Sequence, residues 1–344
     1  MEHSLPHRHG NMSTGSDIKL NCLLESIRDK THHKSIFWRY SEIAEVVELV
    51  VDAVDPKIRV VSRYNKQLRG PVETTWHYLD GLIGLIPGDM RISKRRFGID
   101  PRVRVMFDDL QGMLKLFNES PALTEFFQSH QQAEDSYVFL SMEKKEHNFL
   151  GMELNGDMIR RDVLRTAVTF SNHHILTPAA TEQSAREGIK CCAFEGLLKK
   201  AQQIIFQSHA KRKKLEETKQ RITREIRHLK SELGGEAGGS LNASASLERL
   251  NHELHNVERD LIAARMETES PNRHLQVIID VLNEPQRYVS IKRNALNVNS
   301  MGVKLSTEPS DHGHLIEYAE MEIEQSLKRV AMVASFPKRD LFAY

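Results

Sequence analysis

A long stretch without proline in the middle of the chain restricts the fold more than any other feature. From Thr181 to Leu233, only Gly188 and Gly196 interrupt residues that favour helices. About 50 residues can therefore form one helix of roughly 75 Å. Apolar residues recur at alternating steps of three and four along its distal half, which is typical of a coiled-coil face. We expect one continuous helix over 181–233.

A glycine-rich segment ends this helix and precedes a second heptad run. Residues 234–240 contain four glycines, whose backbone freedom disfavours a continued helix. The apolar positions of the following run are Leu247, Leu250, Leu254, Val257, Leu261 and Ala264. We expect the second helix to pack antiparallel on the distal part of the first, forming a coiled-coil hairpin over 181–267. Its short second arm leaves part of the first helix uncovered, which favours a homo-oligomer over a self-contained hairpin.

The composition argues against several classes of protein. The net charge of +1 provides no overall field that would attract nucleic acid or an acidic membrane. No apolar run approaches the ~20 residues of a membrane span, and the histidine-rich start lacks the apolar core of a signal peptide. Three cysteines cannot form a disulfide framework, so we expect a reducing compartment, the cytoplasm.

The region before the hairpin is predicted to be a disordered leader followed by helices. Residues 1–18 are polar and have nothing to pack with. Helical periodicity dominates 19–180, so we expect an α-helical domain there. The expected helices cover residues 43–54, 57–68, a third beginning at Pro71, 103–117, 122–129, 132–148 and 157–169. A basic stretch from Arg91 to Arg104 is interpreted as a solvated loop rather than a nucleic-acid site, because no nucleic-acid motif accompanies it.

The period changes after Arg265. Leu275, Val277, Ile279 and Val281 alternate and predict a strand. Further strands are expected from Tyr288 to Val298, Leu315 to Ile323 and Val330 to Phe336. Short antiparallel strands at this spacing indicate a small β-barrel over 268–344. The predicted fold class is therefore α+β: a helical domain, a coiled-coil hairpin and a C-terminal barrel.

The run Asn297-Val298-Asn299-Ser300-Met301-Gly302 resembles the [D/N]-x-S-x-x-G motif of the PilZ domain. PilZ domains are six-stranded barrels that bind cyclic di-GMP, and several members carry a long heptad-bearing helix. The resemblance implies a ligand site at Arg273, Arg287, Asn297, Asn299 and Gly302. The run departs from the family at Asn299, where the family has serine, and Glu269 stands where a second clamp arginine would precede Arg273.

Two functions follow from these patterns. The first is a non-enzymatic regulatory protein with a PilZ-like domain, whose ligand would be cyclic di-GMP and which acts through an unknown protein partner. The alternative is a coiled-coil scaffold or adaptor that does not bind nucleotide. No catalytic motif is present, so we expect no enzyme activity, and neither a cofactor nor a metal site is predicted.

Overall fold

The computed structural model describes residues 43–88, 90–107, 109–155, 158–233, 241–305, 313–324 and 327–341. These residues form two compact units. Of the described residues, the first unit contains those in 76–194 and 285–341, and the second contains those in 43–75 and 195–284. Helices α3 (Tyr64–Gly84) and α8 (Glu182–Leu233) contribute to both units. The expected leader, 1–18, and the glycine-rich linker, 234–240, lie outside the described residues.

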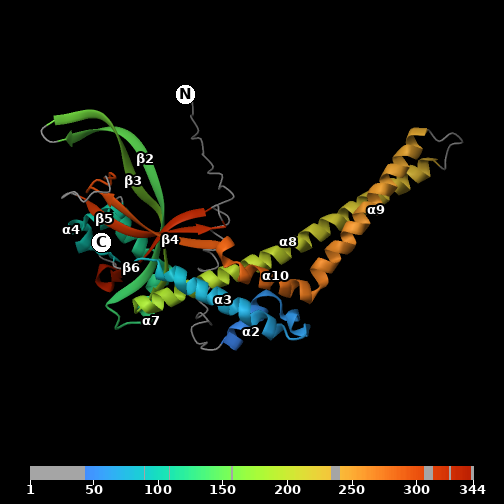
Figure 1. Cartoon of the computed structure of the whole chain (residues 1–344), viewed down its shortest axis with the longest axis horizontal. Coiled ribbons are helices and arrows are strands. Elements are labelled where there is room, and N and C mark those ends of the chain that lie inside the picture. The colour runs from blue at the N-terminus through green and yellow to red at the C-terminus, as the bar shows by residue number, and fades with distance from the viewer. Residues whose placement is uncertain are drawn as a thin grey trace, which may run out of the picture. The chain divides into compact units, whose positions relative to one another are not determined.

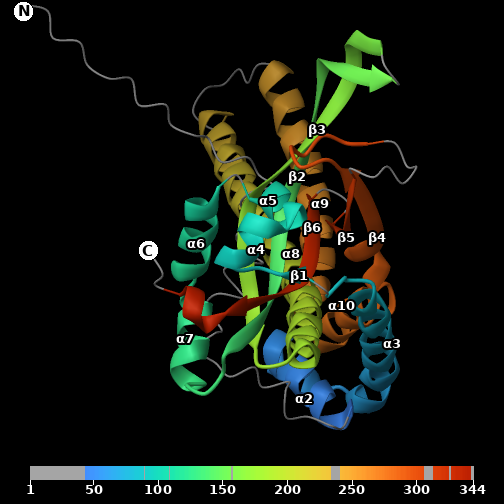
Figure 2. The same cartoon turned by 90° about the vertical axis from the view of Figure 1, so that its left-hand side faces the viewer.

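A six-stranded sheet forms the first unit (Figures 1 and 2). Its strands are β1 (Met90–Arg91), β2 (Asp135–Asn155), β3 (Met158–Ala179), β4 (Val289–Val298), β5 (His314–Ile323) and β6 (Leu327–Pro337). Five of them pair antiparallel in the order β3-β2-β6-β5-β4. The short β1 runs parallel to β6 and pairs with it beyond the residues of β6 that pair with β5. The three C-terminal strands confirm the sequence-based expectation for 288–336.

The closed PilZ-like barrel expected over 268–344 is wrong. The sheet is open between β3 and β4, and two of its strands come from before the hairpin. Residues 303–305 lie across this gap with single bridges to each side: Val303 pairs with Ala167 of β3, and Lys304 pairs with Val298 of β4. The α+β class is confirmed, but the strands come from both ends of the chain.

The N-terminal region is not entirely helical. Residues 132–148 and 157–169, expected as helices, lie mainly in the long strands β2 and β3, which pair with each other. In β2, the five consecutive residues 138–142 are all buried, which is typical of a strand covered on both faces. Helical propensity in a polar stretch is a weak signal, and pairing with β3 and β6 overrides it.

Four short helices pack against the sheet: α4 (Lys94–Ile99), α5 (Pro101–Met106), α6 (Leu110–Asn118) and α7 (Pro121–Ser129). The single helix expected over 103–117 is divided, because the Asp109 carboxylate accepts a hydrogen bond from the Gly112 N–H at 2.7 Å and starts a new helix. The helix expected at 122–129 is confirmed. The Phe117 and Phe336 rings stack 4.1 Å apart and join α6 to β6.

A buried arginine connects three strands of the sheet. Arg329 of β6 is only 1% exposed at its side chain. Its Nε donates to Ser141 Oγ of β2 at 2.7 Å, and its Nη2 donates to the Asn172 carbonyl of β3. The register of β2 on β3 shifts between Ser141 and Glu143, and Asn172 has a positive φ of 51°. Arg329 therefore supplies hydrogen bonds at a place where the backbone pairing of β2 and β3 is irregular.

His174 lies close enough to Arg329 to be affected by its charge. Burial, reinforced by the charge of Arg329, lowers the pKa of His174 to about 4. Glu143 Oε1 lies 3.6 Å from Arg329 Nη1 and partly balances the buried charge. His174 is therefore neutral at neutral pH and adds no charge beside the guanidinium.

The second unit is helical. It contains α2 (Ile43–Val54), the 3-10 turn η2 (Pro56–Val60), most of α8, α9 (Leu241–Glu269) and α10 (Pro271–Asn283). The helix expected at 43–54 is confirmed. Gly70 does not end a helix as expected, because α3 continues through Pro71.

Residues 275–281 form a helix, so the strand expected there is wrong. The buried residues of α10 are His274, Leu275, Ile278, Val281 and Leu282, which follow helical spacing. His274 Nδ1 lies 2.6 Å from Asp55 Oδ2, which attaches α10 to the turn after α2. Burial acts to raise the pKa of Asp55, but hydrogen bonds from His274 and the Lys57 N–H outweigh it and lower that pKa.

We expect Arg329→Ala to lower the free energy of unfolding of the sheet by about 3 kcal/mol, because Ser141 Oγ and the Asn172 carbonyl lose a buried donor and a cavity forms. Chemical denaturation measures the change. Arg293→Ala is the control: Arg293 lies on β4, pairs with Glu317 at 2.6 Å and is 48% exposed. It should cost less than about 1 kcal/mol. Equal effects of the two substitutions would contradict the role of Arg329.

Candidate interaction site

Three of the residues expected to bind a ligand, Asn297, Asn299 and Gly302, lie at the end of β4 and in the turn that follows it. Asn299 Oδ1 accepts hydrogen bonds from the N–H groups of Met301 and Val303 at 3.0 and 2.9 Å. The Gly302 N–H donates to the Asn299 carbonyl at 3.0 Å. The turn therefore directs residues 303–305 back along the end of β4, where the Leu305 N–H donates to the Asn297 carbonyl.

Gly302 is required by this geometry. Its φ of +76° is in the left-handed region that side chains disfavour. A Cβ added to it would lie 3.0 Å from the carbonyl oxygen of Val168 on β3. The amide groups of this turn and the oxygen of Asn299 are engaged with the protein itself, so the turn has a structural role that is independent of any ligand.

The structure brings Asn297, Asn299 and Gly302 together but does not add either predicted arginine. Arg287 ends the 3-10 turn η3 (Pro285–Arg287) just before β4, whereas Asn297 is near the other end of that ten-residue strand. At 3.3 Å per residue the two ends are roughly 30 Å apart. Arg273 lies on α10 in the second unit. The predicted site is therefore not assembled within one unit.

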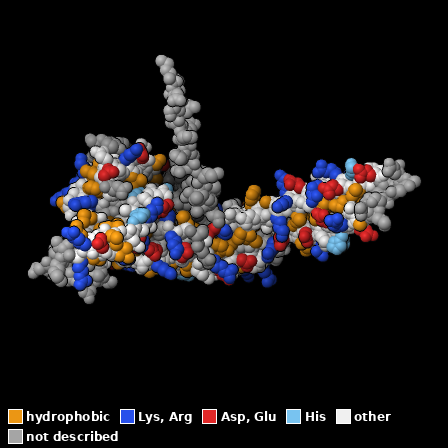
Figure 3. Space-filling view, turned by 90° about the horizontal axis from the view of Figure 1, so that it is seen from above, with side chains coloured by type: hydrophobic (Ala, Val, Ile, Leu, Met, Phe, Trp, Pro, Cys, Tyr) orange, Lys and Arg blue, Asp and Glu red, His pale blue; other side chains and the backbone are white. Residues whose placement is uncertain are grey.

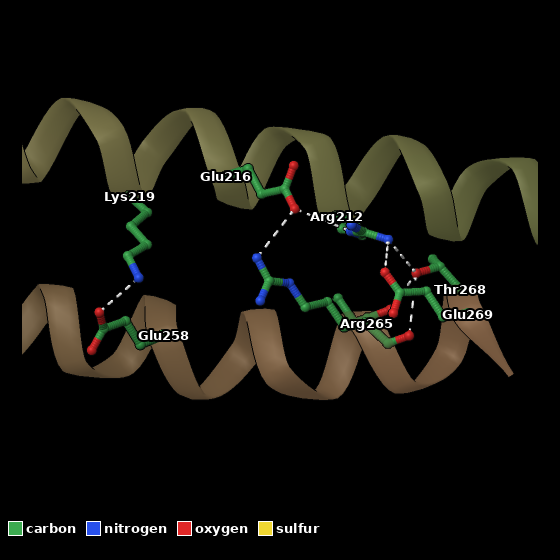
Figure 4. A network of polar contacts seen from close by, with 8 residues as sticks. Arg212, Glu216, Lys219, Glu258, Arg265, Thr268 and Glu269 are labelled. Atoms are coloured by element: carbon green, nitrogen blue, oxygen red, sulfur yellow. Dashed lines mark hydrogen bonds and ion pairs between the residues drawn. The ribbon is translucent and has the colours of Figure 1, made fainter.

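In the second unit, α9 and the distal part of α8 lie side by side as a helical hairpin (Figure 1). Ion pairs join its two helices: Arg212 to Glu269 at 2.6 Å, Arg265 to Glu216 at 3.6 Å and Lys219 to Glu258 at 2.9 Å (Figure 4). A fourth pair joins Arg221 to Glu253 at 3.6 Å. The partner numbers fall on α9 as they rise on α8, so the helices are antiparallel, as expected. The hydrogen bond from Lys219 lowers the pKa of Glu258.

The heptad seam supplies the apolar contact between these helices. Ile222 and Ile226 of α8 are buried, as are Leu261 and Ala264 of α9. The more distal seam residues, such as Leu250 and Leu254, are only partly buried. Ion pairs at exposed positions contribute little to stability, so the seam holds the hairpin together and the charges select its register.

Two apolar side chains of α9 lie on its outer face. Ile262 is 63% exposed and Met266 is 71% exposed. They are four residues apart and therefore neighbours on the helix surface, away from the buried Leu261 and Ala264. Both residues lie outside the heptad seam that the sequence predicts, although their spacing of four is visible in the sequence. Phe206 of α8 is also exposed, at 72%.

A groove of about 500 Å³ runs beside the ion pairs. Its lining is mainly basic and comprises Glu216, Lys219, Gln220, Thr223, Arg224, Arg227, Leu261 and Arg265. Elsewhere on the hairpin, basic and acidic side chains alternate, as the space-filling view shows on its right-hand side (Figure 3). Lys219 and Arg265 of this lining are paired with Glu258 and Glu216, so Arg224 and Arg227 supply the positive charge of the groove beyond those pairs.

Comparisons with protein-family models, curated proteins and solved structures find no match. Within the described part of the chain, no helix is long and apolar enough to cross a membrane. The same residues contain no group of three metal-ligating side chains suited to a metal ion.

We expect Gly302→Ala to destabilise the sheet by about 2 kcal/mol, because alanine is strained at this φ and its Cβ would crowd Val168. Thermal or chemical denaturation measures the effect. Gly98→Ala is the matched control in the same unit: Gly98 lies in α4, and a Cβ there meets no atom within 4 Å. The control should change stability by no more than about 0.5 kcal/mol. If Gly302→Ala is equally mild, the turn does not complete the sheet as described.

Proposed function

We propose that the protein is a non-enzymatic scaffold or adaptor that self-associates through the α8–α9 hairpin. The observation that carries this proposal is the outer face of α9, where Ile262 and Met266 remain exposed although the hairpin already buries its own seam. Apolar neighbours at helical spacing on a heptad-patterned helix suit packing against another helix. A second hairpin of the same chain offers this surface in return, which is the requirement of a two-fold contact.

The basic groove supports the adaptor side of this proposal. Lys219, Arg224, Arg227 and Arg265 surround it, with Glu216 as the one carboxylate of the lining. An acidic helix of another protein would find complementary charge there. The chain's three cysteines suit a reducing compartment, so we place this assembly in the cytoplasm.

The test introduces charge on the outer face of α9. We expect Ile262→Glu with Met266→Glu to reduce the sedimentation mass of the full chain, because burying carboxylates between hairpins is costly. Both side chains are exposed, so the helix content seen by circular dichroism should be unchanged. Gln203→Glu with Gln207→Glu is the control, since it adds the same charge at exposed positions of α8 with the same spacing. A double-Glu variant with the wild-type mass would refute self-association through this face.

A second candidate function is cyclic di-GMP binding at the turn after β4. It is favoured by the motif-like order of Asn297, Asn299 and Gly302. Two exposed basic residues also belong to this part of the chain: Arg287 in η3 and Lys292 in β4. The position of Arg287 argues against this function, because it precedes the end of β4 that is far from the turn. A dianion at the turn would therefore lack the arginine clamp that the PilZ resemblance implies.

Calorimetric titration separates the two functions. On the scaffold proposal we expect no binding heat when cyclic di-GMP is titrated into the wild type. Saturable heat that Asn297→Ala removes would support a receptor. Arg273→Ala, in the other unit, shows in the same experiment whether that arginine takes part.

A further inference from the structure

The strands β2 and β3 continue well beyond the rest of the sheet (Figures 1 and 2). Pairing of β2 with β6 stops at Met142, and residues 303–305 contact β3 only at 166–168. The two strands remain paired with each other out to Asn155 and Met158. We call the described residues 147–155 and 158–165 the ribbon. It is a two-stranded antiparallel element whose two outer edges lack a neighbouring strand within the described sheet.

The ribbon exposes large apolar side chains. Leu150 and Leu164 are directly opposite each other and are 66% and 68% exposed. Met152, two residues further along β2 and therefore on the same face, is 65% exposed. On the other face, Phe149 is 40% exposed, and a Cβ added to Gly151 would lie 3.2 Å from its ring.

A surface of this kind needs a partner on physical grounds. A two-stranded ribbon is marginally stable in water unless a third strand or another element covers it. Open edges are normally protected by charge, and polar residues do so nearer the sheet, from Glu143 to Asn148. Leu150, Leu164 and Met152, which share one face, expose roughly 350 Å² in total, and apolar patches of this size on a monomer are often functional.

The charges of the ribbon indicate what covers it. The sequence from 149 to 165, which adds residues 156 and 157 to the described ribbon, contains three arginines and three acidic residues: Arg160, Arg161, Arg165, Glu153, Asp157 and Asp162. A net charge of zero does not attract nucleic acid or an anionic membrane. The same balanced set suits contact with an identical set, and two such patches with their polar rims approach the ~1,200 Å² of a small specific interface.

We propose that the ribbon binds the ribbon of a second copy of this chain, with the Leu150, Met152 and Leu164 face buried between them. This contact is separate from the one proposed for α9, because the ribbon belongs to the first unit and α9 to the second. Two different two-fold contacts on one chain allow each copy to bind two neighbours. The protein then forms assemblies larger than a dimer, which suits a scaffold.

The experiment combines two pairs of substitutions in the full chain and measures mass by sedimentation velocity. The ribbon pair is Leu150→Ser with Leu164→Ser, and the hairpin pair is Ile262→Glu with Met266→Glu. We expect the wild type to exceed a dimer, each pair alone to give a dimer, and both together to give a monomer. Lys145→Ser with Thr169→Ser, an exposed cross-strand pair nearer the sheet, is the control and should match the wild type.

Other outcomes distinguish the two contacts. A ribbon variant with the wild-type mass overturns the ribbon contact and leaves the hairpin contact standing. If only the hairpin variant keeps the wild-type mass, the hairpin contact is overturned and the ribbon contact stands. Flotation with phosphatidylcholine vesicles, lost in the ribbon variant without any change in mass, would show that the ribbon binds a lipid surface and would also overturn the proposal.

Discussion

The buried guanidinium of Arg329 is the interaction on which the sheet of the first unit depends. It connects β6 to β2 through Ser141 and to β3 through the Asn172 carbonyl, at the point where the pairing of β2 and β3 is irregular. Removing an arginine from water is costly, and hydrogen bonds to fixed acceptors offset that cost only when all the strands are in place. The interaction thus requires strands from before and after the hairpin to be correctly aligned. The ribbon extends from that alignment, because β2 and β3 leave the sheet just beyond it.

The hairpin obeys a different physical rule. Its helices are joined by a local apolar seam. Its exposed ion pairs add little stability and mainly select the register in which the two helices pack. Because the seam involves one side of each helix, the other side is available for contact, and Ile262 and Met266 lie there. The ribbon presents the same situation in β-structure: pairing satisfies one edge of each strand and leaves apolar faces exposed. Both units therefore expose apolar surface on elements that extend away from their own cores, which supports a function in assembly.

The sequence singled out the candidate turn by its resemblance to a ligand-binding motif, and the structure gives the same residues a structural role. Asn297, Asn299 and Gly302 attracted attention as part of a nucleotide-binding motif, yet their contacts explain them as a turn that carries the chain from β4 towards β3. Asparagine accepts hydrogen bonds from nearby backbone groups, and glycine permits positive φ, so the same residue types serve either purpose. Arg287 and Arg273 could not be placed from sequence, because their distance from the turn depends on a strand length and on a division into units.

Local interactions explain what the sequence by itself determined: the hairpin, its antiparallel register, the helices at 43–54 and 122–129, and the three C-terminal strands. Heptads, glycine breaks and alternation act over a few residues and are readable directly. Only the tertiary structure decided that 135–179 forms strands and that 271–283 forms a helix, because in both segments the apolar pattern is ambiguous and burial against distant residues selects the conformation. Only the tertiary structure, likewise, revealed the ribbon and the pairing of β2 with β6. Strands separated by more than a hundred residues pair because they share a core, and their order in the chain does not predict that pairing.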